Sequence, residues 1–329
     1  MGGKLFDLPR MPRAEYLERE AEVRRYLDGV IPGAYRIPRF YGDKADFGDM
    51  DVLVASRPDW DQLRERFVAD LGITGVKSVG HVYSTAYRGL QTDFFTVPAE
   101  YLDTQYDFMS FNDVGNFIGR ICRRFELKWG ERGLAYVYRR ADGNYKADLE
   151  LTGEFGPVCA FLGLDHAQWQ AGFATLEAVF DWVVASRYFS VAPYLDLRGD
   201  LARRVQVRPN VQRFVSYLRE RGIDRRCQFD ERSAYLPLVI AAFPDADLAS
   251  RIERERAAEA RAVAVAARFN GKRVMQLVPG LAGEPLGEFI RAFRASFDDF
   301  PGWVIATSQD EIDRAIVAAA AGRPARPPP

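Results

Sequence analysis

The sequence predicts an α+β protein: a mixed sheet with helices on one face, then a smaller α/β unit, then an all-helical C-terminal domain. Three observations support this order. Residues 33–105 follow the pattern strand, helix, strand, strand, and residues 106–166 combine helices with a short hairpin. Residues 167–320 show helical periodicity almost throughout. Residues 1–32 are expected to form an N-terminal arm and helix, and residues 321–329 a disordered Pro-rich tail.

The composition bounds the possible functions. Lys and Arg together number 45 and Asp and Glu 46, so any nucleic-acid binding has to be local. Three widely spaced cysteines suit neither a zinc site nor a disulfide framework, which fits a cytoplasmic protein. We find no apolar run that could span a membrane and no signal-peptide core. With only two histidines, the chemistry is expected from carboxylates, lysine or metal ions.

The N-terminal arm contains a helix whose apolar residues fall on one face, and the helix ends at the Pro32-Gly33 break, where the first domain begins. A strand follows in which Pro38 marks either a sheet edge or a bulge. Trp60, Leu63 and Phe67 then repeat at helical spacing, before two strands. The expected helix, strand, helix, strand and strand cover residues 13–27, 34–40, 59–71, 75–83 and 86–97.

A run of residues 40–55, FYGDKADFGDMDVLVA, holds the main candidate site. Alternate strand residues share a face, so Asp49 and Asp51 point the same way while Met50 and Val52 enter a core. Two adjacent carboxylates repel unless a cation lies between them, and oxygen ligands of this kind suit Mg²⁺ or Mn²⁺. The alternative is a solvated acidic turn before an ordinary strand.

A third acid, Asp93, lies on the strand expected at residues 86–97 and shares a face with Gln91 and Phe95. Pairing of this strand with the one that carries Asp49 and Asp51 would bring the three carboxylates together. Such a group could hold two metal ions that activate an attacking oxygen and steady a leaving phosphate.

Gly-Asp-Met-Asp before Val-Leu-Val, with Thr-Asp-Phe-Phe around Asp93, resembles the palm of the DNA polymerase beta superfamily of nucleotidyltransferases. The resemblance implies that Asp49 and Asp51 bind two divalent ions, Mg²⁺ or Mn²⁺. It implies that Asp93 binds the catalytic ion and helps deprotonate the attacking 3′-hydroxyl.

The glycine turn before these acids is the expected nucleotide site. In the family, a glycine and a small hydroxyl residue hold the triphosphate through backbone N–H groups. This chain has Gly42, Asp43 and Lys44 there, followed by Gly48, so Lys44 and Arg39 would supply the positive charge. The alternative is a tight surface turn with solvated charges.

Residues 106–166 resemble the thumb of X-family DNA polymerases. A helix over 114–125, capped by Asn112 or Asp113, precedes strands over 135–139 and 146–151. A Thr-x-Glu helix start and a Leu-Gly-Leu end follow. The resemblance implies nucleotide-sensing roles for Asn116 and Arg120. The family's Tyr-Phe-Thr-Gly-Ser signature is absent, and Asp-Phe-Met-Ser stands in its place.

Two basic stretches could contact a nucleic-acid backbone. Residues 119–146 and 200–226 each carry eight basic and three acidic residues, a local charge of +5. The alternative is an ordinary exposed helix and hairpin. The candidate nucleic-acid contacts are Arg123, Arg124, Lys128, Arg203 and Arg204.

The remaining residues predict helices over 173–188, 247–268 and 288–297. Residues 269–287 are similar to a C-terminal element of bacterial CCA-adding enzymes and poly(A) polymerases, which favours RNA as the acceptor. We therefore expect a metal-dependent nucleotidyltransferase that joins nucleotides from NTP or dNTP substrates to a nucleic-acid 3′-hydroxyl, with an RNA end preferred.

Three alternatives stay open: an X-family-like DNA polymerase, a transferase that modifies a protein or small molecule, and a non-catalytic nucleic-acid-binding protein. The sequence does not determine the nucleotide, template dependence or oligomeric state.

Overall fold

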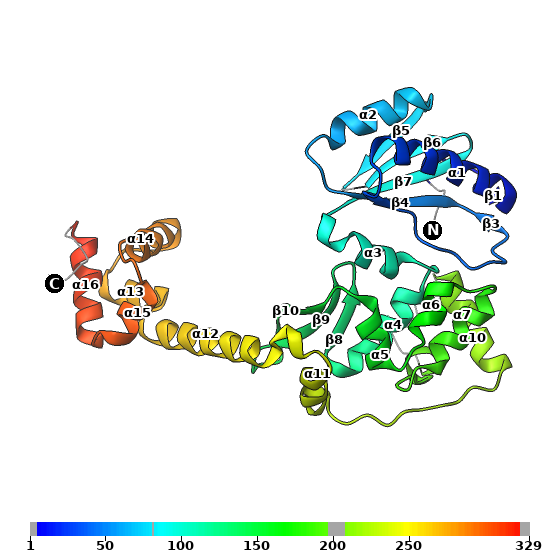
Figure 1. Cartoon of the computed structure of the whole chain (residues 1–329). Helices are drawn as coiled ribbons and strands as arrows, with labels where there is room; N and C mark the ends of the chain where they lie inside the picture. Colours follow the sequence, from blue (N-terminus) through cyan, green and yellow to red (C-terminus); the bar gives the residue numbers. More distant parts are fainter. Residues whose placement is uncertain (1–4, 81, 197–207, 323–329) are drawn as a thin grey trace. The chain divides into compact units, whose positions relative to one another are not determined.

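The computed structural model describes residues 5–80, 82–196 and 208–322 (Figure 1). They form two compact units. The first runs to Leu248 except for the hairpin tip Arg140–Asn144, which belongs with the second unit, from Ala249 onward. The finer division at residues 33, 106 and 167 stays a prediction. Within the described ranges, no helix is both long and apolar enough to cross a membrane.

A five-stranded sheet lies in the N-terminal part of the first unit. The neighbouring strands are, in order, β2 (Tyr35–Arg36), β4 (Asp49–Ala55), β7 (Leu90–Val97), β6 (Val82–Tyr87) and β5 (Gly75–Val79). β4 and β7 run parallel and the other pairs antiparallel, which confirms the mixed sheet. Two short strands, β1 (Met11–Pro12) and β3 (Asp46–Phe47), pair separately.

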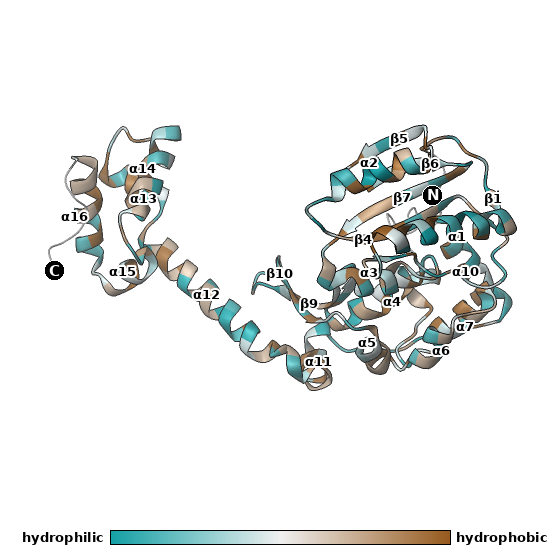
Figure 2. Ribbon diagram, turned by 45° about the horizontal axis from the view of Figure 1, so that its top comes forward, coloured by the Kyte–Doolittle hydropathy of each residue, from teal (hydrophilic) through white to brown (hydrophobic). Residues whose placement is uncertain are grey.

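The alternation in β4 separates a core face from a polar face. Met50, Val52 and Val54 are fully buried in one hydrophobic cluster with residues of α1 (Arg13–Val30) and α2 (Trp60–Asp70). Figure 2 shows the hydrophobic colouring of β4 and β7. Leu53 lies on the opposite face with Asp49 and Asp51, where it packs in a second cluster with α3 (Leu102–Met109), after the 3₁₀ turn η1 (Ala99–Tyr101).

Three strand predictions need correction. The strand expected over 34–40 is reduced to the two residues of β2, and the two strands expected over 75–83 and 86–97 are three. Gly80 has φ +61°, while Arg88 and Gly89 have φ +45° and +83°. Left-handed residues reverse the chain in tight turns, so both expected strands are interrupted.

A second sheet, in the same unit, has the order β10 (Tyr145–Thr152), β9 (Gly133–Arg139) and β8 (Leu127–Gly130). The strand β8 was not predicted. The helix expected over 114–125 is divided into α4 (Val114–Cys122) and the 3₁₀ turn η2 (Arg123–Phe125). The helical segment ends there because Glu126 is left-handed, with φ +53°. Asp113 stands directly before α4, in the cap position.

The rest of the described part of the first unit is mainly helical. Its helices are α5 (Phe155–Leu162), α6 (His166–Ala171), α7 (Leu176–Ala185), α8 (Ala192–Leu195), α10 (Pro209–Glu220) and α11 (Leu236–Ala242), with η3 (Arg232–Tyr235) and η4 (Pro244–Ala246). The helix expected over 173–188 is the shorter α7, because Thr175 caps its start.

The second unit is helical, as predicted. It contains α12 (Leu248–Arg268, whose first residue belongs to the first unit), α13 (Gly271–Leu277), α14 (Gly283–Ala295), α15 (Phe300–Ala306) and α16 (Gln309–Ala320). Phe269, Phe293 and Phe300 form the centre of its core. The helix expected over 247–268 is confirmed as α12, and the one expected over 288–297 begins earlier, at Gly283.

Candidate metal centre

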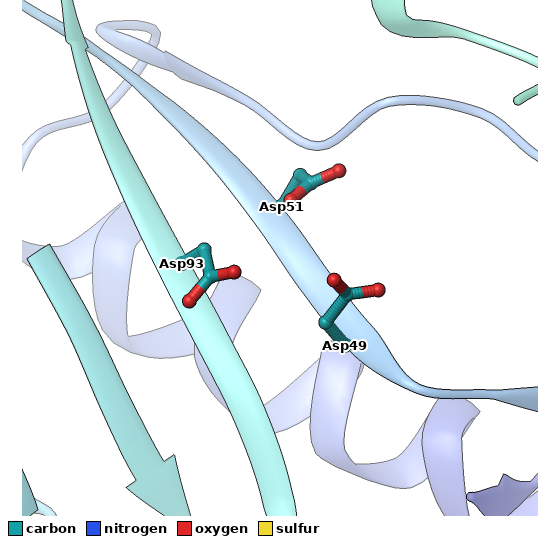
Figure 3. A group of neighbouring side chains, drawn as sticks. All are labelled: Asp49, Asp51 and Asp93. Carbon is teal, nitrogen blue, oxygen red and sulfur yellow. The ribbon is translucent and has the colours of Figure 1, made fainter. Parts of the chain in front are cut away.

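Two parallel strands bring three carboxylates together. In the β4–β7 register Asp51 lies beside Asp93, and Asp49 lies beside Gln91. Figure 3 shows the three aspartates on one side of these strands. One carboxylate oxygen from each lies within 4.8 Å of one from each of the others. The pairing of β4 with β7 therefore brings Asp49, Asp51 and Asp93 together, as the sequence predicted.

The acids destabilise one another's charged forms. Burial raises the pKa of Asp51 to about 7, and the negative charges of Asp49 and Asp93 add to this effect. The pKa of Asp49 is also raised, first by burial and then by the charge of Asp93. A divalent cation between these oxygens would remove the repulsion, and oxygen ligands suit Mg²⁺ or Mn²⁺. The donor set therefore fits the predicted ions.

Gln91 orients the third acid. Its side-chain N–H₂ donates to both carboxylate oxygens of Asp93, at 3.1 and 2.8 Å, and its carbonyl oxygen accepts from the Leu5 N–H at 3.1 Å. Gln91 and Asp93 are both buried. The strand alternation in the sequence placed Gln91 on the same face as Asp93 but did not predict a role for it. The spacing of an amide two residues before an acid on one strand is the pattern that could have predicted this hydrogen bond.

Lys44 lies in the electric field of the centre. Burial lowers the pKa of Lys44, and the negative charges of Asp49 and Asp51 oppose that shift. Its ammonium nitrogen lies 4.2 Å from the centre of the Phe47 ring and 3.5 Å from Oδ1 of Asn112. A cation held so close to the acids is placed to meet the charge of a phosphate, although its nucleotide-binding role stays a prediction.

The glycine turn contacts protein rather than open space. The N–H groups of Gly42 and Asp43 donate to the carbonyl oxygens of Phe173 and Ala174, both at 2.8 Å. A Cβ at Gly42 would lie 2.7 Å from the Ala174 oxygen, so close approach is the reason for glycine here. Both donors are taken in this conformation. Gly48 is buried directly before Asp49.

Three other predicted nucleotide ligands have partners within the fold. The Arg39 guanidinium donates to the carbonyl oxygens of Trp169 and Gln170, at 2.8 and 3.0 Å. Arg120 donates to the Pro193 carbonyl oxygen at 2.7 Å. The Asn116 amide donates to Asp113 at 3.2 Å. These hydrogen bonds give each of the three side chains a role in holding the fold, and their roles as nucleotide ligands stay predictions.

The predicted nucleic-acid contacts differ in their surroundings. Lys128 forms an ion pair with Asp148 at 2.6 Å. Arg124 lies 5.0 Å from the centre of the Phe229 ring, and Arg123 is exposed. The other two candidates, Arg203 and Arg204, lie outside the described residues.

No family model matches this sequence, and no curated protein matches it. Among solved structures, the chain is similar to the ternary gap complex of Leishmania infantum polymerase beta, with 16% sequence identity and a TM-score of 0.32. The match covers 40% of this chain and 52% of the polymerase chain, so it spans about half the length of that protein.

Proposed function

We propose that the protein is a metal-dependent nucleotidyltransferase that joins nucleotides from NTPs to a nucleic-acid 3′-hydroxyl, with an RNA end as the preferred acceptor. The observation that carries the proposal is the convergence of Asp49, Asp51 and Asp93, whose carboxylate oxygens lie within 4.8 Å of one another. Three acids on adjacent parallel strands, with raised pKa values at Asp49 and Asp51, are suited to binding divalent cations.

The chemistry follows from the roles of these residues. Asp49, Asp51 and Asp93 would hold two ions, which when bound neutralise charge on the attacking hydroxyl and on the leaving pyrophosphate. Asp93, held by Gln91, would accept the hydroxyl proton on a carboxylate oxygen. The hydroxyl oxygen would form a bond to the α-phosphorus, the bond from that phosphorus to the oxygen bridging the α- and β-phosphates would break, and pyrophosphate would leave with that oxygen. Lys44 would attract the negative triphosphate.

A second candidate is transfer to a protein or small molecule. It is favoured by the internal partner of a residue expected to contact nucleic acid. Lys128 forms an ion pair with Asp148 at 2.6 Å, so part of its charge is not available to a phosphate backbone.

An acceptor screen tests the proposal. The purified full-length chain would be incubated with Mg²⁺ and each labelled NTP or dNTP, with tRNA, single-stranded RNA, primed DNA or no acceptor. We expect labelled RNA ends with the unmutated chain and none with Asp93→Ala. The matched control is Asp61→Ala, an exposed aspartate of α2. Equal labelling by Asp93→Ala contradicts the proposed centre, and label found only on protein supports the second candidate.

A further inference from the structure

Residues 5–7, here called the strap, lie on the sheet face that carries the metal centre. Through the β5–β6 and β6–β7 registers, Gly75 lies in line with Gln91. Directly opposed strand residues point to the same side of a sheet, as do residues two apart on one strand. Gly75 and Lys77 therefore share the face of Gln91 and Asp93. The strap contacts this face on both β7 and β5.

Leu5 is held at both of its backbone polar groups by side chains of the sheet. Its N–H donates to the carbonyl oxygen of Gln91 at 3.1 Å, and its carbonyl oxygen accepts from the Lys77 ammonium at 2.6 Å. A Cβ at Gly75 would lie 3.3 Å from the Phe6 ring, and the Lys77 ammonium nitrogen lies 5.1 Å from the centre of that ring. Glycine therefore leaves room for Phe6, and the strap is held from β7 to β5.

The chain that follows the strap is tied to the strand of the other two acids. Asp7 is left-handed, with φ +53°, and turns the chain toward β1. The strand β1 pairs with β3, and only Gly48 separates β3 from Asp49. The Arg10 guanidinium also donates to Asp46 of β3 at 2.8 Å. The N-terminal segment is thus fixed at both strands of the centre.

Gln91 links the strap to the third acid. Its carbonyl oxygen accepts from the strap, and its N–H₂ donates to both carboxylate oxygens of Asp93. Gln91 is only 6% exposed, so loss of the Leu5 N–H would leave a buried carbonyl oxygen without a donor. Rotation of the amide toward water would relieve that cost, and it would withdraw the N–H₂ group from Asp93.

We propose that the strap is a positioning element for Asp93. The Leu5 N–H fixes the Gln91 amide, Gln91 fixes the Asp93 carboxylate, and Lys77 holds the strap in place. The inference rests on the proposed function for its effect on catalysis, because Asp93 accepts the hydroxyl proton in that function. The chain of hydrogen bonds itself needs neither metal nor substrate.

One pair of substitutions separates the backbone donor from the side chain that carries it. Proline has no N–H, so Leu5→Pro removes the donor, whereas Leu5→Ala keeps it. NMR of the isotope-labelled full-length chain in EDTA would follow the Gln91 side-chain amide, whose signal is identified by its loss in Gln91→Leu. We expect Leu5→Pro to shift this signal and to speed exchange of its protons about 2- to 10-fold, while Leu5→Ala leaves it unchanged.

Steady-state kinetics test the consequence for catalysis. The kcat of Leu5→Pro should be about 2- to 10-fold below that of Leu5→Ala, with KM for NTP and for the acceptor little changed. Lys77→Met releases the Leu5 carbonyl oxygen without a change in the backbone, so it should also lower kcat. Lys77→Arg keeps a donor there and should restore kcat. The control is Lys272→Met, which changes an exposed lysine of α13.

The outcomes separate this inference from the proposed function. An unshifted Gln91 signal in Leu5→Pro overturns the inference, and so does a kcat equal to that of Leu5→Ala. A lower KM for the acceptor with a higher kcat/KM in Leu5→Pro also overturns it, because the strap would then be a barrier to the acceptor. A shifted Gln91 signal in a chain that transfers no nucleotide refutes the proposed function alone.

Discussion

Replacement of Asp51 by asparagine should stabilise the metal-free protein at pH 8. The folded-state pKa of Asp51 is about 7, and an unfolded aspartate has a pKa of about 4. The folded chain therefore binds this proton more tightly. Stability contributed by the group is present at low pH and is lost as pH rises from about 4 to about 7, because the folded state then has to release the proton.

The size of the effect follows from that difference. A difference of three pKa units corresponds to a loss of at most roughly 4 kcal/mol in the free energy of unfolding at pH 8. Protonation of the neighbouring acids makes this loss smaller. Asparagine is nearly the shape of protonated aspartate and has no charge to repel Asp49 and Asp93. The free energy of unfolding of Asp51→Asn should thus exceed that of the unmutated chain by about 1–4 kcal/mol in EDTA at pH 8.

Chemical denaturation at pH 5 and pH 8, with and without Mg²⁺, measures these differences. The two proteins should differ about a third as much at pH 5 as at pH 8, because only about one of the three pKa units lies below pH 5. Mg²⁺ should stabilise the unmutated chain at pH 8 but not Asp51→Asn. Asp61→Asn, which changes an exposed aspartate, is the control. A metal-free Asp51→Asn protein that is less stable at pH 8, or that Mg²⁺ stabilises equally, refutes the electrostatic reasoning.

Three further outcomes are expected. Gln91→Leu removes the hydrogen bonds to both Asp93 oxygens, so the Asp93 carboxylate is no longer held in position. In steady-state assays kcat should fall at least about 10-fold while KM for NTP changes little. An unchanged kcat excludes positioning by Gln91. Gly42→Ala places a Cβ 2.7 Å from a carbonyl oxygen and should cost about 1–3 kcal/mol in denaturant melts, whereas neutral stability contradicts the close approach. Phe293→Ala should cost about 3–5 kcal/mol in the second unit, with Mn²⁺ binding by the first unit retained, and loss of Mn²⁺ binding argues against independent units.

Local patterns were sufficient for part of this structure. The two-residue strand period fixed which side of β4 carries Asp49 and Asp51, and helical spacing in α12 identified that helix with almost the right ends. Turn positions were harder to predict. The interruption between β6 and β7 was missed because Arg88 carries no turn signal, although the left-handed Gly89 beside it does.

Contacts between distant segments were not accessible to such patterns. Gly42 is 132 residues before Ala174, whose carbonyl oxygen occupies the space that a side chain would need, so a turn alone suggested a phosphate loop.

Binding of Mn²⁺ tests the central claim most directly. Titration of the full-length chain, followed by electron paramagnetic resonance, should reveal two bound ions per chain at pH 8 and weak magnetic coupling between them. Asp51→Asn and Asp93→Asn should each abolish the coupling, while Asp61→Asn should leave it unchanged. Mn²⁺ binding that is unaffected by either substitution within the cluster would contradict a metal centre at Asp49, Asp51 and Asp93.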